Sequence, residues 1–284
     1  MTKSRRYATV EAFDAALKRR LVARAGGRRT IQQLRKQIAF DRILARLNHV
    51  APDAWLLKGG VALEYRLQRA RATVDIDIST QFSLDHIINA LKTSAAVELN
   101  DYFTLRLGER SQPVNDVAIY RFKLTVLYED DRLFEELKLD VGFADPWLGE
   151  PQELTAPPLL EFAGIKPATV RAIPIEQHLA EKIHAYTRRR GNRESTRVKD
   201  LVDMALLVDD PHLDGSLLAE TVQAVFAQCA THDIPAALPE PPSSWRVTYP
   251  RLAADLPVPQ TSDEAHRHVA EALTDALKAA PSFR

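Results

Sequence analysis

Residues 55–79 read WLLKGGVALEYRLQRARATVDIDIS and combine an apolar run, a pair of glycines, a short helical segment and a strand with two aspartates. The apolar run that opens the stretch predicts a strand from Trp55 to Lys58. Gly59 and Gly60 predict a turn that opens the helical segment. We interpret the rest of the chain around this stretch.

Asp75 and Asp77 are separated by one residue on the predicted strand, so their side chains point to the same face. Val74, Ile76 and Ile78 are then expected to face the core. The two carboxylates would stand roughly 6 to 7 Å apart, backbone to backbone, and repel each other unless a cation lies between them. Mg²⁺ is the simplest candidate, because it takes one or two carboxylates and completes its shell with waters and substrate phosphates. A solvated edge strand is the alternative interpretation.

The composition is that of a soluble globular protein, with 284 residues, 45% hydrophobic and 27% charged. The net charge is zero and argues neither for nor against a nucleic-acid partner. Cys229 is the single cysteine, which excludes an internal disulfide and fits a reducing compartment. Because no stretch approaches the roughly 20 apolar residues of a membrane span, we expect a cytoplasmic protein without membrane contact.

Two helices are predicted before the glycine stretch, over residues 10–24 and from about 30 to 48, from apolar positions at helical spacing. Residues 1–36 carry eleven Lys or Arg against two acids, Glu11 and Asp14. Such a patch suits a phosphate backbone, although a solvated helix face is an equally good interpretation.

Residues 102–143 alternate apolar with polar positions, and this period of two predicts strands around 102–109, 118–128 and 133–143. Asp140 faces away from the apolar side of the third strand. If this strand lies beside the one that carries Asp75 and Asp77, three carboxylates converge and form a candidate metal site.

The segment 145–174 is rich in proline and predicts a linker or surface loop with little regular structure. Helices are expected over 175–189, from about 196, and over 262–279. We therefore predict two domains, at 1–150 and 151–284. The second contains Lys182, together with Asp200 and Asp203, which lie close to each other on a helix surface.

These parts suit phosphoryl-type transfer from a nucleoside triphosphate. Glycines let the backbone approach phosphates closely, and carboxylates can hold the Mg²⁺ that clamps the attacking and leaving oxygens. Lys182 or Lys58 is a candidate for neutralising the triphosphate. Asp200 or Asp203 is a candidate for orienting or deprotonating the attacking hydroxyl.

Four motifs in this order resemble the AbiEii-like toxins of type IV toxin–antitoxin and abortive-infection systems, within the DNA polymerase beta-type nucleotidyltransferase superfamily. The motifs are Leu57-Lys58-Gly59-Gly60-Val61-Ala62-Leu63, Arg71-x-Thr73-x-Asp75-Ile76-Asp77, Glu181-Lys182-Ile183-x-Ala185 and Arg197-x-Lys199-Asp200-Leu201-x-Asp203. In the wider superfamily Leu139-Asp140-Val141 also matches. The resemblance covers about residues 55 to 207.

The resemblance implies an α/β fold: a mixed-sheet nucleotidyltransferase domain preceded by N-terminal helices and followed by a helical C-terminal domain. It further implies Mg²⁺ dependence, a nucleoside triphosphate donor, a cognate antitoxin and an RNA acceptor, with the tRNA 3′ end as the expected target and a block of translation as the result. By position, the resemblance implies that Gly59 and Gly60 hold phosphate, that Asp75 and Asp77 hold the metal, and that Lys182 meets the triphosphate, with Lys58 a further candidate for phosphate binding.

Two alternatives stay open. One is the same chemistry on a small molecule or a protein hydroxyl. The other is a catalytically silent RNA-binding partner.

Overall fold

A computed structural model describes residues 5–26, 29–67, 70–111, 119–143, 147–188, 191 and 194–279. By their internal contacts the residues form two compact units. Unit 1 comprises Met1–Gln68, Ala72–Asp145 and Pro151–Ala172, and unit 2 comprises Arg69–Arg71, Pro146–Glu150 and Ile173–Arg284. Each unit is described by itself.

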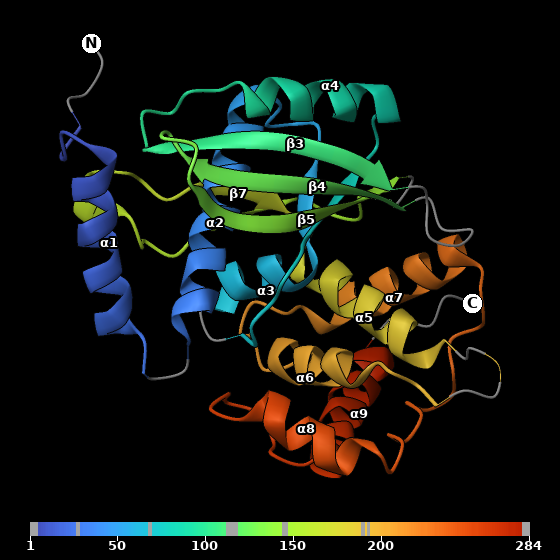
Figure 1. Cartoon of the computed structure of the whole chain (residues 1–284). Coiled ribbons are helices and arrows are strands. Elements are labelled where there is room, and N and C mark those ends of the chain that lie inside the picture. The colour runs from blue at the N-terminus through green and yellow to red at the C-terminus, as the bar shows by residue number, and fades with distance from the viewer. Residues whose placement is uncertain are drawn as a thin grey trace. The chain divides into compact units, whose positions relative to one another are not determined.

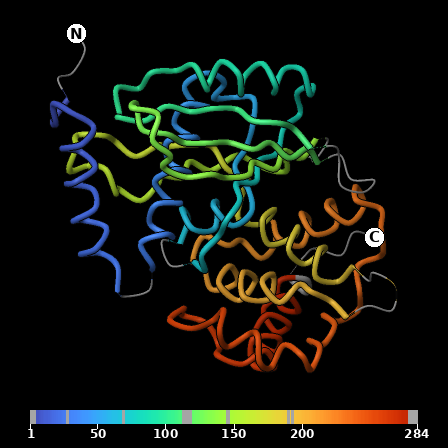
Figure 2. The backbone as a smooth tube through the Cα atoms, viewed as in Figure 1, coloured from blue at the N-terminus to red at the C-terminus, as the bar shows by residue number. Residues whose placement is uncertain are grey.

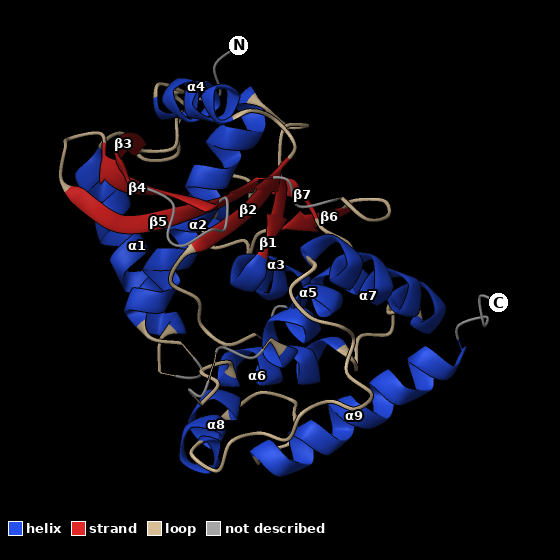
Figure 3. Cartoon of the chain, turned by 90° about the vertical axis from the view of Figure 1, so that its right-hand side faces the viewer, coloured by secondary structure: helices blue, strands red, loops and turns tan. Residues whose placement is uncertain are grey.

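Unit 1 contains the strands of the described chain, which form one seven-stranded mixed sheet in the order β3-β4-β5-β2-β1-β7-β6 (Figures 1 and 3). The strands are β1 (Leu56–Lys58), β2 (Ile76–Thr80), β3 (Phe103–Ser111), β4 (Ile119–Tyr128), β5 (Leu133–Phe143), β6 (Gln152–Thr155) and β7 (Thr169–Ala172). Its helices are α1 (Val10–Arg24), α2 (Ile31–Val50), α3 (Gly59–Leu67) and α4 (Leu84–Ala95), with a short 3₁₀ turn at Glu161–Ala163.

The stretch 55–79 contributes two neighbouring strands, β2 and β1, near the centre of the sheet. β1 runs into α3, and the backbone then passes through residues 70–75 into β2, as the trace in Figure 2 shows. β2 pairs antiparallel with β1 and parallel with β5. The two acidic strands are therefore neighbours, which was the condition for Asp77 and Asp140 to lie together.

Helices α2 and α4 contact each other and cover one face of the sheet. Ile76 and Ile78 of β2 and Leu139 and Val141 of β5 are buried, and they join the core cluster that α2 contributes to. The N-terminus of α2 is fixed by a capping box, in which Thr30 Oγ1 accepts from the Gln33 amide and the Gln33 side chain accepts from the Thr30 amide. Because Leu139 and Val141 of β5 face this core, the alternating residues of β5 leave the other face of the strand polar.

Unit 2 is helical in its described residues (Figure 3). Its helices are α5 (Ile175–Thr187), α6 (Val198–Leu207), α7 (Gly215–Cys229), α8 (Trp245–Ala253) and α9 (Ser262–Ala279). The helix expected at 262–279 is confirmed, and α5 and α6 begin close to where the periodicity placed them. Neither α7 nor α8 is predicted from the sequence.

The Pro-rich segment differs from its prediction as a linker with little regular structure. β6 and β7 form a hairpin within it, and Leu57 of β1 pairs with Ala172 of β7. The compact units accordingly place Pro151–Ala172 with the sheet, whereas the predicted domains divided the chain after residue 150. The prolines stand outside these strands, so the ladder hydrogen bonds are kept.

Val74 is a second correction. It precedes β2 and its side chain is 54% exposed, so it does not share the buried face of Ile76 and Ile78. The strand begins at Ile76, which makes Asp75 the residue immediately before the strand.

Among the described helices, none has the length and apolarity that crossing a bilayer requires.

Candidate active site

The Gly59-Gly60 turn packs directly against the acidic segment. Gly59 has φ +64°, a left-handed conformation that L side chains rarely adopt. A Cβ at Gly59 would lie 2.8 Å from the carboxyl carbon of Asp77, and one at Gly60 would lie 2.6 Å from Thr73 Oγ1. The two glycines are therefore required by close approach to Asp77 and Thr73, in addition to any role in phosphate binding.

The sheet register brings Asp77 and Asp140 together. Asp77 of β2 is opposite Asp140 of β5 in the parallel pair and opposite Lys58 of β1 in the antiparallel pair. Neighbouring strands are about 4.8 Å apart, so the carboxylates of Asp77 and Asp140 share one small region of the polar face. Both side chains are partly exposed, as is Asp75.

Arg121 is a member of this site that the sequence analysis did not identify. It lies on β4 opposite Asp140, and its Nε and Nη2 donate hydrogen bonds of 2.7 and 2.6 Å to the two oxygens of Asp140. The pKa of Arg121 is raised above its ordinary value, first by the hydrogen bond to Asp140 and then, against the opposing effect of burial, by the charges of Asp140, Asp75 and Asp77. The guanidinium therefore lies in the field of all three carboxylates.

The acidic residues fit a magnesium ion as a two-carboxylate site. Asp75 and Asp77 supply the oxygen donors that Mg²⁺ takes from a protein when substrate phosphates and waters complete its shell. Both oxygens of Asp140 already accept from Arg121. In the ranges that the structure describes, no group of three or more His, Cys, Asp or Glu side chains is arranged to hold a metal ion.

The predicted residues of unit 2 form a cluster of ion pairs. Lys182 Nζ of α5 lies 2.8 Å from Asp200 Oδ1 and 2.9 Å from Asp203 Oδ2, both on α6. Arg71 donates two hydrogen bonds of 2.8 Å to Asp203, and Arg197 lies 3.4 Å from Asp200. Three cations thus contact two carboxylates among these side chains.

Burial governs the electrostatics of this cluster. Asp203 is fully buried; burial alone would raise its pKa, but Lys182 and Arg71 lower it below the ordinary value. Burial alone would lower the pKa of Lys182, but Asp203 and Asp200 raise it well above the ordinary value. Lys182 therefore stays charged. Its ammonium has three N–H donors, and the two carboxylates account for two of them.

The basic N-terminal segment is largely engaged within unit 1. Ion pairs join Arg5 to Glu129, Lys18 to Asp14, Arg29 to Glu64 and Lys36 to Glu135, while Arg20 and Arg35 donate to the carbonyls of Ala16 and Phe134. Arg6, Arg19 and Arg24 are exposed. Lys3 and Arg28 lie outside the described residues, as do four residues of the basic stretch 188–193.

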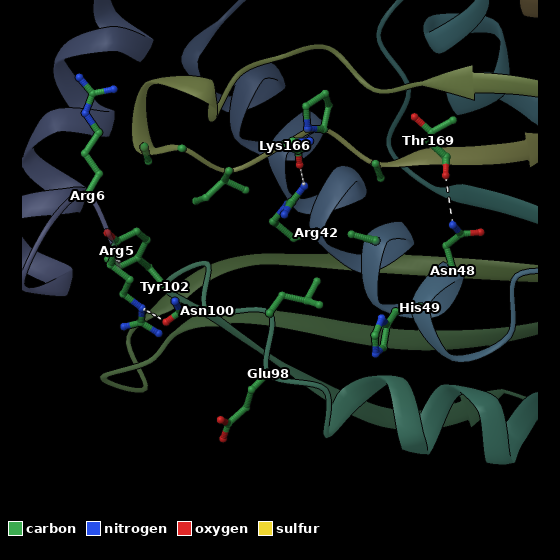
Figure 4. Close-up of a pocket in the computed structure, with 17 residues that line it drawn as sticks. Arg5, Arg6, Arg42, Asn48, His49, Glu98, Asn100, Tyr102, Lys166 and Thr169 are labelled. Atoms are coloured by element: carbon green, nitrogen blue, oxygen red, sulfur yellow. Dashed lines mark hydrogen bonds between the residues drawn. The ribbon is translucent and has the colours of Figure 1, made fainter. Parts of the chain in front are cut away.

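A separate cavity of about 830 Å³ opens in unit 1 between α2, the start of β3 and the segment 163–169 (Figure 4). Arg42 points into it and donates to the Lys166 carbonyl, but its guanidinium is also bound to Asp41. Arg5 is bound to Asn100 and Glu129. Arg5 and Arg42 are therefore neutralised by neighbouring acids, which weakens their attraction for an anion in the cavity.

A family model described as the nucleotidyl transferase AbiEii toxin of the type IV toxin–antitoxin system matches residues 42–279. The chain belongs to the AbiEii family. It is therefore a nucleotidyltransferase toxin of the toxin–antitoxin class, as the four motifs predict. The search of curated proteins gave no match.

Solved structures show the same fold. MenT4, a nucleotidyltransferase toxin from Mycobacterium tuberculosis, has a TM-score of 0.63 and 16% identity, with 94% of this chain and 90% of MenT4 covered. JHP933 from Helicobacter pylori has a TM-score of 0.51 and 16% identity, with 87% of this chain and 92% of JHP933 covered. At this identity the similarity establishes the α/β nucleotidyltransferase fold of this AbiEii chain.

Proposed function

We propose that this AbiEii toxin is a Mg²⁺-dependent enzyme that transfers nucleotides from a nucleoside triphosphate to RNA, with the tRNA 3′ acceptor end as the acceptor and arrest of translation as the outcome. The observation that carries the proposal is the packing of the Gly59 turn against Asp77, next to Asp75, in a chain of this family. Nucleotidyl transfer at such a site requires a hydroxyl placed in line with the bond to the leaving phosphate of the triphosphate. The 3′ end of tRNA presents such a hydroxyl.

The residues have distinct roles in this proposal. Asp75 and Asp77 hold the ion, which supplies charge neutralisation and alignment of the phosphates. Lys58, Gly59 and Gly60 bind phosphate near the start of α3. Lys182 offers its remaining donor to the triphosphate, and Asp203 is a positioning residue, because its fully buried carboxylate already binds Arg71 and Lys182.

Asp200 is a less enclosed residue than Asp203. Its side chain is 8% exposed, against 0% for Asp203, and it binds Lys182 and Arg197. We assign Asp200, rather than Asp203, to contact with the acceptor hydroxyl. Arg71, which holds Asp203, stands four residues before Asp75 in the chain.

The test is transfer of label from each of the four radiolabelled triphosphates to bulk tRNA. Replacing Asp75 or Asp77 with Asn should abolish transfer, while Asp85→Asn, an exposed carboxylate in the first turn of α4, should leave it intact. Transfer of label by the Asp75→Asn variant at the level of the unaltered protein would contradict the proposal.

Two other acceptors are separated by the same assay. Label in protein or in a small-molecule fraction, rather than in RNA, favours a protein or small-molecule hydroxyl. Absence of both Mg²⁺ and nucleotide binding in calorimetry favours a silent RNA-binding partner. Membership of the family supports a cognate antitoxin, which a pull-down from the native host tests. We further propose that the protein acts in the cytoplasm, where tRNA is found.

A further inference from the structure

Two lysines face each other on the polar side of the sheet. β3, β4 and β5 lie side by side at one edge of the sheet (Figure 1). Lys123 of β4 is directly opposite Lys138 of β5, and both side chains are exposed. On the β3 side lies Gly108, where an added Cβ would stand 3.2 Å from the Cβ of Lys123. This row across three strands therefore consists of a glycine and two lysines.

The two lysines are poorly neutralised within the chain. Like charges that are directly opposite each other on neighbouring strands repel, which is unfavourable in the free protein. Glu136 lies 2.9 Å from Lys123, but both side chains are about half exposed, so this ion pair contributes little. In the part of the chain that the structure describes, no hydrogen bond or ion pair holds the ammonium of Lys138. A ligand with regularly spaced negative charges would offset the repulsion.

Lys138 stands beside the acidic segment of β2. Leu139 of β5 is paired with Ile76 of β2, and Lys138 and Asp75 are the residues immediately before them. Lys138 and Asp75 are therefore at the same level of the sheet. The strand order β4-β5-β2-β1 puts the two lysines on one side of β2 and the Gly59 turn on the other.

This order separates the two substrates of a transfer reaction. In-line displacement places the attacking and leaving oxygens at opposite ends of the transferred group, with the metal ion clamping both. The proposed function assigns the triphosphate to the Gly59 turn, at the end of β1, and the ion to Asp75 and Asp77 of β2. The acceptor strand then approaches from the side of β5, where the lysines lie.

We propose that Lys138, supported by Lys123, binds a backbone phosphate of the acceptor RNA strand close to its 3′ end. The inference rests on the proposed function and gives the acceptor a subsite outside the four family motifs. A lysine ammonium is a compact point charge on a flexible stem, which suits the single charge of a phosphodiester. Such contacts supply affinity and orientation without reading the base sequence.

The test separates binding of the acceptor from binding of the donor. We would titrate fluorescein-labelled tRNA by anisotropy at several salt concentrations on the full chain. The double variant Lys123→Gln with Lys138→Gln should weaken tRNA binding about tenfold at about 0.15 M salt and reduce the slope of log affinity against log salt by about 1 to 2, as for two lost single-strand phosphate contacts. In the labelling assay the KM for tRNA should rise by a similar factor.

Donor binding should not change. Calorimetry with a Mg²⁺-bound α,β-methylene nucleoside triphosphate should give the same affinity for the double variant as for the unaltered protein. Lys123→Arg with Lys138→Arg keeps both charges and should retain the tRNA affinity and the salt slope. The matched control is Lys92→Gln with Lys166→Gln, which removes two exposed lysines of unit 1, one on α4 and one in the segment 163–169.

The contrary results are also defined. If the glutamine pair changes the salt slope and the KM for tRNA no more than the control pair does, the inference is wrong and the proposed function stands. Loss of analogue binding in the glutamine pair would place the lysines at the donor and would equally contradict the inference. If the unaltered protein transfers no label to tRNA, the proposed acceptor itself fails and the subsite with it. Circular dichroism and a thermal melt of each variant exclude unfolding as the cause.

Discussion

Asp203 is the residue whose environment most restricts its role. Its carboxylate is fully buried; Arg71 donates to both of its oxygens, and Lys182 also contacts Oδ2. A carboxylate enclosed in this way cannot accept a proton from an incoming hydroxyl without leaving its partners. Its contribution at the residue scale is therefore to hold the two cations.

Removing Arg71 should destabilise the protein because Asp203 would keep only one of its partners. We expect Arg71→Met to lower the free energy of unfolding by about 3 kcal/mol, within the range for a broken buried ion pair. Arg197→Met is the control, because Arg197 is 36% exposed and lies 3.4 Å from Asp200; its cost should stay below about 1 kcal/mol. Equal losses in urea denaturation would contradict the assignment.

His184 should make the stability of the protein depend on pH. Burial, and then His232 and Arg188, lower its pKa from 6.5 to about 4. The unfolded chain therefore binds a proton between these values that the folded chain does not, so stability falls as pH decreases from about 6.5 to about 4. The groups facing His184 are Thr231, whose hydroxyl lies 2.8 Å from Nε2, and the rings of His232 and Phe226.

The measurement is the free energy of unfolding at several pH values for the unaltered protein and for His184→Asn. The variant should show a shallower decrease in this pH window. An unchanged pH dependence would assign the effect to other groups, such as His232, whose pKa is also lowered.

At the scale of elements, the junction of β1 and α3 is the least tolerant turn. Gly59 combines φ +64° with an overlap against Asp77, whereas Gly164 has φ +74° and no atom within 4 Å of an added Cβ. Gly164→Ala should therefore cost only the backbone strain, about 1 to 2 kcal/mol.

Gly59→Ala should cost clearly more than Gly164→Ala, and it should also abolish transfer, because the new methyl displaces the Asp77 carboxylate. Denaturation and the labelling assay measure the two effects. If both alanine variants lose the same free energy and retain transfer, the close approach to Asp77 has no functional meaning.

Local patterns predicted most elements because the physical signals are local. Apolar spacing placed α1, α2 and α9. Ser83 caps α4, with its Oγ accepting from the His86 amide. β6 and β7 are four residues each and lie among prolines, so alternation is too short to be recognised. They become strands because β1 offers β7 an edge to pair with.

At the scale of the whole molecule, the net charge of zero does not show which cations are paired with acids and which are exposed. Most of the described basic residues of the N-terminal segment are bound to acids or carbonyls of unit 1. Contact with an RNA backbone would therefore fall to exposed residues such as Arg19 and Arg24 of α1.

Replacing both Arg19 and Arg24 with Gln should weaken tRNA binding and reduce the slope of log affinity against log salt by about 1 to 2, as expected for two lost phosphate contacts. The control is the pair Lys92→Gln and Arg251→Gln, which removes two exposed cations elsewhere. A fluorescence anisotropy titration at several salt concentrations decides between them; the same slope for both pairs would leave α1 without a role in RNA binding.

The sequence alone determined the family, the α/β class and the positions of the glycines and aspartates, because these signals depend on neighbours within a few residues. Only the tertiary structure decided which charges meet. Arg121 reaches Asp140 across 19 residues and Arg71 reaches Asp203 across 132, through strand register in one case and through a loop residue that contacts α6 in the other. Such pairs depend on how elements align in space, and alignment is set by burial of the apolar faces rather than by the charged residues themselves.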